Sequence, residues 1–548
     1  MLRRQIPLAL PLSLYLSSAF IGALIAYDPA KSGYVLSFIV ISVVLYCTVV
    51  FVQGQRDLLL WFVLLFIVLS AVLVVYFAIQ HDWTESPLSN PLINRIGIRL
   101  RQALEPLPVQ APHPNNLAGI LELALPLCFA LAVHWVYTRQ HRRATAALVI
   151  AFVLAIGILL SDSRGAWLAL GTAAILALAW KGLQSFQRTS RSWKPFRSAL
   201  GLVLVLCIAL LALAALIGRF IGISEAANGF STEIPRLSLY RQVLSLLRDY
   251  LFTGSGLGTF PMVYSTYALL GNVFILPHAH NILLQIWVEQ GLLGVMAFVW
   301  LVVAFYVCVW RRREQLGWLA RGGLIATTVM LLHGLVDAAL WYSDWTRVLL
   351  FFPMALTVAG LGTVPVRVDH ARIAVLTAVF GLVCIVIVGS PVAALWEANL
   401  GSLAQTQVEL GQYEFPERLV EYTRRDADLT RAENYFRQAL VLDRSNVTAN
   451  QRLALIALAR GNYAEALTRA ETAYGQNAND AVTWQLLGDA YLASGQLDQA
   501  YVYWSKVDDA PSRLYEEMNV RYVPQRDRMR AEWTKTLADR IRVHSSAQ

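Results

Sequence analysis

Side chains that can exchange protons and accept hydrogen bonds open one otherwise apolar stretch of the chain, Leu276 to Gly294. His278 and His280 stand two residues apart, and Asn281 follows them directly. Histidine changes its charge near neutral pH, so an imidazole here could act as a general acid or base. Because the apolar tail continues to Trp310, we expect this polar head at the edge of a membrane span, where unpartnered polar groups are costly. A helix cap with two interfacial histidines is the structural alternative.

Two further polar side chains continue this stretch at helical spacing. Gln285 and Glu289 are four residues apart, so on a helix they share one face, which runs back one turn to Asn281. Pro277 predicts a helix start close by, since proline is tolerated in a first turn. On such a helix the two histidines would point about 200° apart and could not share one task. Glu289 would lie about two and a half turns inside, too deep to react directly, and is expected to orient a neighbour.

The elements that must position these residues are membrane spans. The chain has 548 residues, of which 57% are hydrophobic and 15% charged. Apolar runs near the ~20-residue spanning length recur to about residue 393, which predicts an all-α, polytopic helical membrane protein. We expect about eleven spans, at roughly 7–27, 33–53, 58–80, 116–137, 144–161, 164–181, 198–220, 285–310, 320–336, 347–363 and 372–393. The five cysteines lie inside these runs without CxxC spacing, so neither a disulfide framework nor a zinc site is expected.

Positive charge alternates between the loops, which explains the net charge of +9 without a nucleic-acid partner. One set of loops is rich in lysine and arginine: Arg3 and Arg4, Arg56, Arg139 to Arg143, Lys181 to Arg197, Arg311 to Arg313, and Arg367 to Arg372. The positive-inside rule therefore places the N-terminus in the cytoplasm. No small-residue cleavage site follows the first apolar run, so we expect a retained span. An odd number of spans then puts the C-terminal part outside the cytoplasmic membrane.

Two long loops fall on the outer side in this topology, at about 81–115 and 221–284. Within the second, Arg236 to Leu251 has apolar residues at helical spacing, which predicts an amphipathic helix near the membrane surface. Its apolar face would hold Leu237, Tyr240, Val243, Leu244 and Leu247, and its other side Arg236, Arg241 and Arg248. The glycine-rich turn from Gly254 to Phe260 allows a close approach of backbone to a ligand, although plain loop geometry explains it more simply.

Polar groups also mark the outer ends of other spans. The hairpin around Arg164 is too short for a free loop, so this arginine is expected near the lipid headgroups, where snorkelling to phosphate is the ordinary explanation. His113 to Asn116 opens the fourth span, with Glu122 two turns inside it. His333 and Asp337, four residues apart, end another span. All of these groups fall on the same side as the two histidines.

The C-terminal part changes character, with frequent charges and helix-periodic apolar residues, so we expect a membrane domain over 1–397 and an external helical domain over 398–548. A repeat of 34 residues pairs Leu453 with Leu487, Gly461 with Gly495, and Ala466 with Ala500. Tryptophan, Leu-Gly, tyrosine and alanine at these offsets resemble the tetratricopeptide repeat (TPR), which implies an α-solenoid. Residues 432–507 should form antiparallel helix pairs that pack on a partner or on the membrane domain. These pairs should bury Trp484, Leu487, Tyr491 and Trp504.

Several short motifs, in this order and on one side of the membrane, look like those of the O-antigen ligase, O-antigen polymerase and O-oligosaccharyltransferase superfamily. They are Pro114-Asn115-Asn116, Ser163-Arg164-Gly-Ala-Trp167, Arg236-Leu-Ser-Leu-Tyr240, Gly254-Ser-Gly256-Leu-Gly258-Thr-Phe260, His278-Ala-His280-Asn281-Ile-Leu-Leu-Gln285 and Glu289-Gln-Gly291-Leu-Leu-Gly294. The resemblance covers about 110–360. It implies a GT-C-like enzyme that takes a glycan from a polyprenyl diphosphate carrier outside the cytoplasmic membrane and passes it to an acceptor hydroxyl of a sugar chain, lipid or protein. The TPR-like tail departs from the plain ligases. It leaves open which acceptor is used, and therefore whether the enzyme is a ligase, a polymerase or a protein oligosaccharyltransferase.

The resemblance also gives the polar residues roles. Arginine stays protonated and grips phosphate oxygens bidentately, so Arg164 and Arg236, with Arg241 behind them, are expected on the diphosphate leaving group. His280 matches the histidine that precedes asparagine in the family and would take the acceptor proton. Binding or orienting roles remain for His278, Asn281 and Glu289. No Asp-x-Asp pair occurs in the outer loops, so we expect transfer without metal or other cofactor.

Two other functions would also suit a polytopic chain. A transporter or flippase of polysaccharide would use intramembrane charges and broken helices, but the charges here gather at one face of the membrane and not at its midplane. A membrane-anchored scaffold that only displays the repeats to a protein partner would not need the polar face at all. The enzyme remains the preferred prediction.

Overall fold

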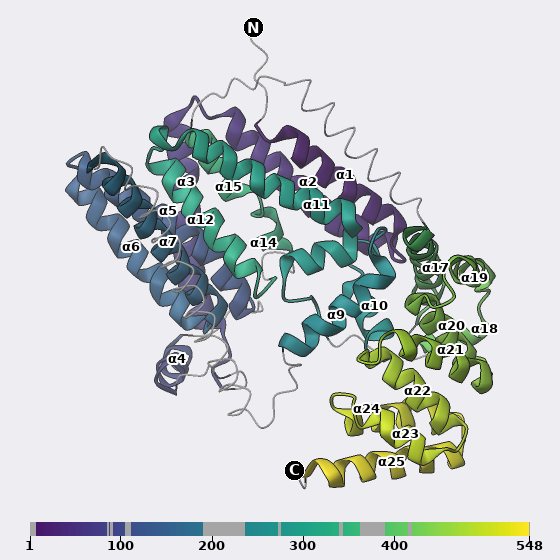
Figure 1. Ribbon diagram of the computed structural model, residues 1–548. Helices are drawn as coiled ribbons and strands as arrows, with labels where there is room; N and C mark the ends of the chain where they lie inside the picture. Colours follow the sequence, from purple (N-terminus) through teal and green to yellow (C-terminus); the bar gives the residue numbers. More distant parts are fainter. Residues whose placement is uncertain are drawn as a thin grey trace.

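The computed structural model describes residues 7–84, 87, 91–104, 111–189, 236–271, 276–338, 343–361, 390–414 and 419–546. The regular elements in these ranges are helices and no strand occurs among them, which confirms the all-α class. Figure 1 shows two parts: a bundle of long helices, and a smaller array of shorter helices at one of its ends. Two expected spans, 198–220 and most of 372–393, lie outside the described residues.

The bundle is built from apolar helices whose lengths suit a bilayer. Its helices are α1 (Ala9–Ile25), α2 (Pro29–Phe51), α3 (Arg56–Gln80), α5 (Pro114–Tyr137), α6 (His141–Leu160), α7 (Arg164–Thr189), α11 (Ile282–Arg311) and α12 (Trp318–Gly334), with the short turn η1 (Arg313–Gln315). Within the described ranges, α2, α3, α5, α6 and α11 are long and apolar enough to cross a membrane. The prediction of a polytopic helical membrane protein is therefore confirmed.

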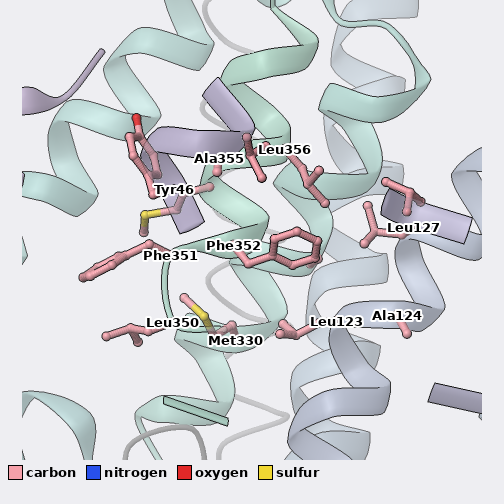
Figure 2. Packing of buried hydrophobic residues seen from close by; sticks show 14 of the residues in the cluster. Tyr46, Leu123, Ala124, Leu127, Met330, Leu350, Phe351, Phe352, Ala355 and Leu356 are labelled. Carbon is pink, nitrogen blue, oxygen red and sulfur yellow. The ribbon is translucent and has the colours of Figure 1, made fainter. Parts of the chain in front are cut away.

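The expected span over 347–363 is broken into α14 (Asp344–Val348) and α15 (Phe352–Gly360). At 1.5 Å per residue α15 is about 13 Å long, and within the described residues Thr346–Gly360 is one of the shorter apolar helices. Its residues from Phe352 to Ala359 are all buried, as expected for a helix that is apolar on every side. Figure 2 shows Phe351 and Phe352 packed among side chains of the surrounding bundle, so this segment fills the interior of the bundle.

One end of the bundle gathers the starts of α5, α7 and α11 and the end of α12, and we call it the site end. Side-chain contacts define it: Asn115 reaches Asp337, which follows α12, and a Cβ on Gly165 would touch His333. The amphipathic helices α4 (Pro91–Ala103) and α9 (Arg236–Tyr250) lie at this end, together with the short, mostly buried helix α10 (Phe260–Tyr267) (Figure 1).

The face that α9 buries differs from the expected one. Leu239, Val243, Leu246 and Leu247 are buried, whereas Leu237 and Leu244 are exposed. The side of α9 that packs on protein therefore does not coincide with the apolar face expected near the membrane surface. The reason is tertiary: α9 is covered by the C-terminal helices, and this contact selects which of its leucines are enclosed.

The C-terminal array consists of paired helices. They are α17 (Ser390–Gly411), α18 (Val420–Asp426), α19 (Thr430–Leu442), α20 (Val447–Ala459), α21 (Tyr463–Gln476), α22 (Ala481–Ala493), α23 (Leu497–Trp504), α24 (Ala510–Glu517), η2 (Met518–Tyr522) and α25 (Arg528–Ser546). A Cβ on Gly488 would lie 2.4 Å from Trp504, so a glycine is required where α22 crosses α23. Leu487 and Trp504 are buried as expected. Trp484 and Tyr491 are only half-buried, so the expected burial was wrong for these two, and Tyr491 stacks on Tyr503.

Candidate active site

The histidine pair lies in a short loop before α11 and not inside a helix. Asn281 is the N-cap of α11, and its Oδ1 accepts the N–H groups of Leu283 and Leu284 at 3.0 and 3.1 Å. His280 has a φ of 48°, a left-handed conformation that a regular helix cannot hold. The helix start expected near Pro277 was therefore wrong, because the asparagine cap fixes the start at Ile282.

Because the loop is not helical, the two histidines face each other. Their ring centroids are 4.0 Å apart, so the expectation that they point about 200° apart was also wrong. The N–H of His280 donates to Nδ1 of His278 at 3.2 Å. Nδ1 of His280 lies 3.1 Å from Oδ1 of Asp337, and Nδ1 of His278 lies 3.8 Å from the same oxygen. One carboxylate therefore faces both rings.

Asp337 is the residue that the sequence reasoning did not include among the candidate site residues. Its other carboxylate oxygen accepts the side-chain N–H of Asn115 at 2.8 Å. Asn115 stands in the first turn of α5, which His113 caps by accepting the N–H of Asn115 at 3.2 Å. The only sequence signal for Asp337 was a carboxylate at the end of a span on the same side as the histidines.

Two polar side chains in the first turns of α11, Gln285 and Glu289, connect the helix to the histidine loop. Gln285 Nε2 donates to Oε1 of Glu289 at 2.9 Å, so the two share a face as predicted. Gln285 Oε1 accepts the N–H of Ala279, the residue between the histidines, at 2.8 Å. Glu289 is therefore connected to the loop through Gln285, and its orienting role stays a prediction.

The glycine-rich turn binds the backbone of α11. The N–H groups of Ser255 and Gly256 donate to the carbonyls of Val288 and Glu289 at 2.7 and 3.1 Å. These carbonyls are free for that contact because Gly291, with φ 67° and ψ −167°, kinks the helix just beyond them. The glycines thus allow the turn to approach the backbone of α11, and not a ligand. The turn holds α11 at the point that follows the histidine loop.

Helix α9 brings tyrosine and arginine to the same loop. Tyr240 Oη donates to the carbonyl of His280 at 3.0 Å. Arg236 stands four residues earlier, on the same face of α9. Its charge is close enough to affect His278: burial, with the positive charges of His280, Arg236 and His113, lowers the pKa of His278 to about 3. His278 is therefore neutral at physiological pH.

The carboxylate in this group is ionised. Burial alone would raise the pKa of Asp337, but the hydrogen bond from His280 and the charges of the neighbouring histidines hold that pKa well below its usual range. An ionised Asp337 can only accept a hydrogen bond, so Nδ1 of His280 is the donor in this pair, and in a neutral His280 ring the lone pair is then on Nε2. This nitrogen is the atom of the loop best suited to take up a proton.

A second histidine–carboxylate pair lies next to the first. Nδ1 of His333 is 2.8 Å from Oε2 of Glu122, and both side chains are buried. His333 also meets Gly165, where a Cβ would lie 2.8 Å from its Nε2. Arg164 is exposed at the start of α7, directly before Gly165, which packs against His333. Arg241 is exposed on α9, and no described contact joins it to the histidines.

The same group has a geometry that a metal ion could use. One ligand atom each from His278, His280 and Asp337 lie within 4.8 Å of one another. In the structure these atoms bond to each other and to the loop backbone. The absence of a metal requirement stays a prediction.

The helical bundle and its polar site end together define a multi-pass membrane protein with a histidine–carboxylate centre under an amphipathic helix. Residues 146–299 match the family model of the O-Antigen ligase, and residues 457–503 match that of the Tetratricopeptide repeat. These matches confirm the resemblance to the O-antigen ligase superfamily and the TPR-like repeats. Asn115 and Asp337 lie outside both matched segments. No match was found among curated proteins or among solved structures.

Proposed function

We propose that the protein transfers a glycan from a polyprenyl diphosphate carrier to an acceptor hydroxyl at the outer face of the cytoplasmic membrane. The observation that carries this proposal is the pairing of His280 with Asp337 at the bundle's site end, beneath the helix that bears Arg236. A base and a fixed positive charge at the edge of a bilayer are what transfer from a lipid diphosphate requires. The O-Antigen ligase match over this region supports the same class of reaction.

His280 is the base in this proposal. The acceptor oxygen attacks the first sugar of the donor at its anomeric carbon, and its proton passes to Nε2 of His280. The bond between that carbon and the diphosphate oxygen breaks, and its electron pair leaves with the lipid diphosphate. Asp337 keeps the imidazole in the required tautomer and stabilises the imidazolium that forms. The energy of the reaction resides in the sugar–diphosphate bond, so no nucleotide is needed.

The arginines stabilise the leaving group. Negative charge grows on the diphosphate as the bond breaks, and fixed positive charge placed there is often the largest catalytic contribution. Arg236 is one helical turn from Tyr240, which bonds the histidine loop. We assign it to the diphosphate first, with Arg164 at the start of α7 and Arg241 as a secondary contact.

A transporter or flippase is disfavoured by where the charges lie. The histidines, Asp337 and Arg236 gather at one end of the bundle, whereas alternating access places its site near the bilayer midplane. The acceptor class is open: transfer to a growing glycan, to a lipid-linked sugar or to a protein hydroxyl would each use the same centre.

The test is transfer by the purified full-length protein from a defined polyprenyl diphosphate oligosaccharide to each acceptor class. Removing a general base costs roughly 10²–10⁴-fold in rate, so His280→Ala should nearly abolish transfer while the donor still binds. His278→Ala should be milder, and dialysis against EDTA should leave the rate unchanged. If wild type binds the donor but transfers to no acceptor, or if His280→Ala turns over normally, the proposal fails.

A further inference from the structure

The TPR-like helices and the site share one hydrophobic core. The buried face of α9, which includes Leu239 and Val243, packs in one cluster with Leu455 of α20 and Leu487 of α22. The same cluster contains Ala279, the residue between the two site histidines. Figure 1 shows α9 and α10 between the bundle and the C-terminal helices. The repeats are therefore packed together with the element that approaches His280.

A buried ion pair joins the two parts. Arg452 of α20 is almost fully buried, and its guanidinium bonds Asp249, near the end of α9, at 2.6 and 2.8 Å. The same guanidinium donates to Tyr250 Oη at 3.1 Å and lies 3.5 Å from the ring centroid of Tyr267 in α10. Since a buried charge is costly without partners, this set of contacts specifies one arrangement of α9 on α20.

Further contacts hold the same end of α9. Ser245 and Arg248 bond the carboxylate of Asp480, the N-cap of α22, at 2.8 and 3.1 Å. Asn399 of α17 accepts the N–H of Phe252 at 2.9 Å and donates to the carbonyl of Arg248 at 2.7 Å. The C-terminal half of α9 is thus fixed by three helices of the C-terminal array.

The other end of α9 carries the groups that reach the site. Tyr240 bonds the carbonyl of His280, and Arg236 lies one turn further out. Helix α9 is continuous over 15 residues, about 22 Å, so a shift of its C-terminal end should also move its N-terminal end. From the bundle, Trp287 of α11 donates to the carbonyl of Leu251 at 3.0 Å, whereas the buried ion pair comes from the repeats.

We infer that the TPR-like array is an intramolecular clamp on α9, with Arg452 as a positioning residue that sets Arg236 and Tyr240 against the His280 loop. The role assigned to Arg236 rests on the proposed function. The surfaces of α20 and α22 that pack on α9 are enclosed, so a partner protein would have to use another face of the repeats.

The experiment compares full-length wild type with Arg452→Met, Arg452→Lys and Asp249→Asn. Arg460→Met is the matched control, because Arg460 lies just after the same helix and its ion pair with Glu433, 2.6 Å, stays inside the repeats. Amide hydrogen exchange over 236–250 and the donor KM are measured for each variant. Arg452→Met should speed exchange in α9 but not in α12, and should raise the donor KM about tenfold, as expected when a binding contact is misplaced.

Arg452→Lys should recover part of both effects, and Arg460→Met should match wild type. The clamp is overturned if Arg452→Met and Asp249→Asn both leave exchange in α9 and the donor KM at wild-type values. If Arg452→Met loosens every helix, Asp249→Asn decides, because it removes the charge without removing volume. If α9 loosens selectively while wild type transfers no glycan, the clamp stands and the proposed function fails.

Discussion

The hydrogen bond between His280 and Asp337 joins residues 57 positions apart, and the proposed chemistry depends on it. When the Asp337 carboxylate accepts the hydrogen bond from Nδ1–H of His280, Nε2 is the nitrogen that can take up a proton. The same carboxylate stabilises the imidazolium that forms. Asn115 fixes the second oxygen of the carboxylate, so the aspartate can turn only by breaking that bond. Three segments of the chain thereby orient one imidazole.

Asp337→Asn tests this orientation because it keeps the shape and removes the charge. We expect kcat to fall roughly 10²–10⁴-fold with little change in the donor KM, since the wrong tautomer and an unstabilised imidazolium affect the chemical step. Initial rates at saturating donor measure the effect. Asp57→Asn, in the first turn of α3, is the control and should be normal. A normal kcat in Asp337→Asn would mean that the charge of Asp337 has no part in the chemical step and that the residue is structural.

Arg236→Lys tests the contact with the diphosphate. The substitution keeps the charge but loses the planar fork that binds two phosphate oxygens, so transfer should still be clearly impaired and the donor KM raised. Arg241→Lys, on the exposed side of the same helix, should have the smaller effect. Normal turnover in both Arg164→Ala and Arg236→Ala, at normal expression, would refute the assignment of these arginines.

His278 makes the stability of the fold dependent on pH. Its folded pKa of about 3 lies below its ordinary value of 6.5, so the folded state favours the neutral ring. That stabilisation is present above pH 6.5 and is lost as the pH falls toward 3. On the order of 2 kcal/mol should be lost between about pH 7.5 and 5. Thermal unfolding of wild type and His278→Gln at both values measures this, and equal pH dependence in the two proteins would contradict it.

The candidate site could be predicted only in part at this scale. His280, Asn281 and Glu289 stand in one stretch, so their order and spacing were enough to single them out. Asp337 is brought to them by the way α12 ends beside α5, which is a tertiary relation that no local spacing encodes. The facing histidine rings depend on the left-handed conformation of His280, which a helical projection of the sequence excludes.

At the scale of elements, the kink in α11 connects the glycine-rich turn to the histidine loop. Gly291 breaks the helical backbone, and the carbonyls of Val288 and Glu289 then accept hydrogen bonds from the turn. The histidine loop, Glu289 of α11 and the glycine-rich turn that follows α9 are therefore connected by hydrogen bonds. A change at the kink should act on the site although it lies about three turns from His280.

Gly291→Ala should be strongly destabilising. A Cβ there would lie 2.2 Å from the carbonyl oxygen of Phe252, and the φ of 67° is unfavourable for alanine. Strain of this kind costs about 1–3 kcal/mol, so the midpoint of thermal unfolding should fall. Gly171→Ala in α7 is the control, because a Cβ there has nothing within 4 Å. Equal unfolding midpoints in the two variants would show that the kink relaxes without cost.

The existence of the elements was more predictable than the faces they bury. Runs of apolar residues of spanning length identify the bundle helices, because the bilayer imposes that length. The break between α14 and α15 was not visible, since a buried apolar segment has the same composition whether or not it spans. The side of α9 that packs on protein leaves out Leu237 and Leu244, because the repeats, far away in sequence, determine which side is buried.

At the scale of the whole molecule, the repeats and the site occupy the same end of the bundle. The boundary expected at 397/398 falls inside α17, whose Asn399 and Thr406 bond the end of α9. The two predicted domains are thus joined by a helix that also contacts α9, and the division between them stays a prediction. In the proposed reaction, the repeats would flank the face where transfer occurs.

The orientation of the whole chain in the membrane is the last prediction. The end of the bundle opposite the site carries most of the described arginines of the bundle: Arg56 at the start of α3, Arg139 between α5 and α6, Arg142 and Arg143 in the first turn of α6, and Arg311 to Arg313 at the end of α11. The positive-inside rule assigns that end to the cytoplasm, which places the site and the repeats outside. A reporter that is active only after export should therefore work when fused after Gln548, and a reporter that is active only in the cytoplasm should work when inserted between Arg139 and Gln140, in the loop before α6. A C-terminal fusion that works only in the cytoplasm would put the site on the wrong side for an exported lipid-linked donor, and the proposed reaction would fail with the topology.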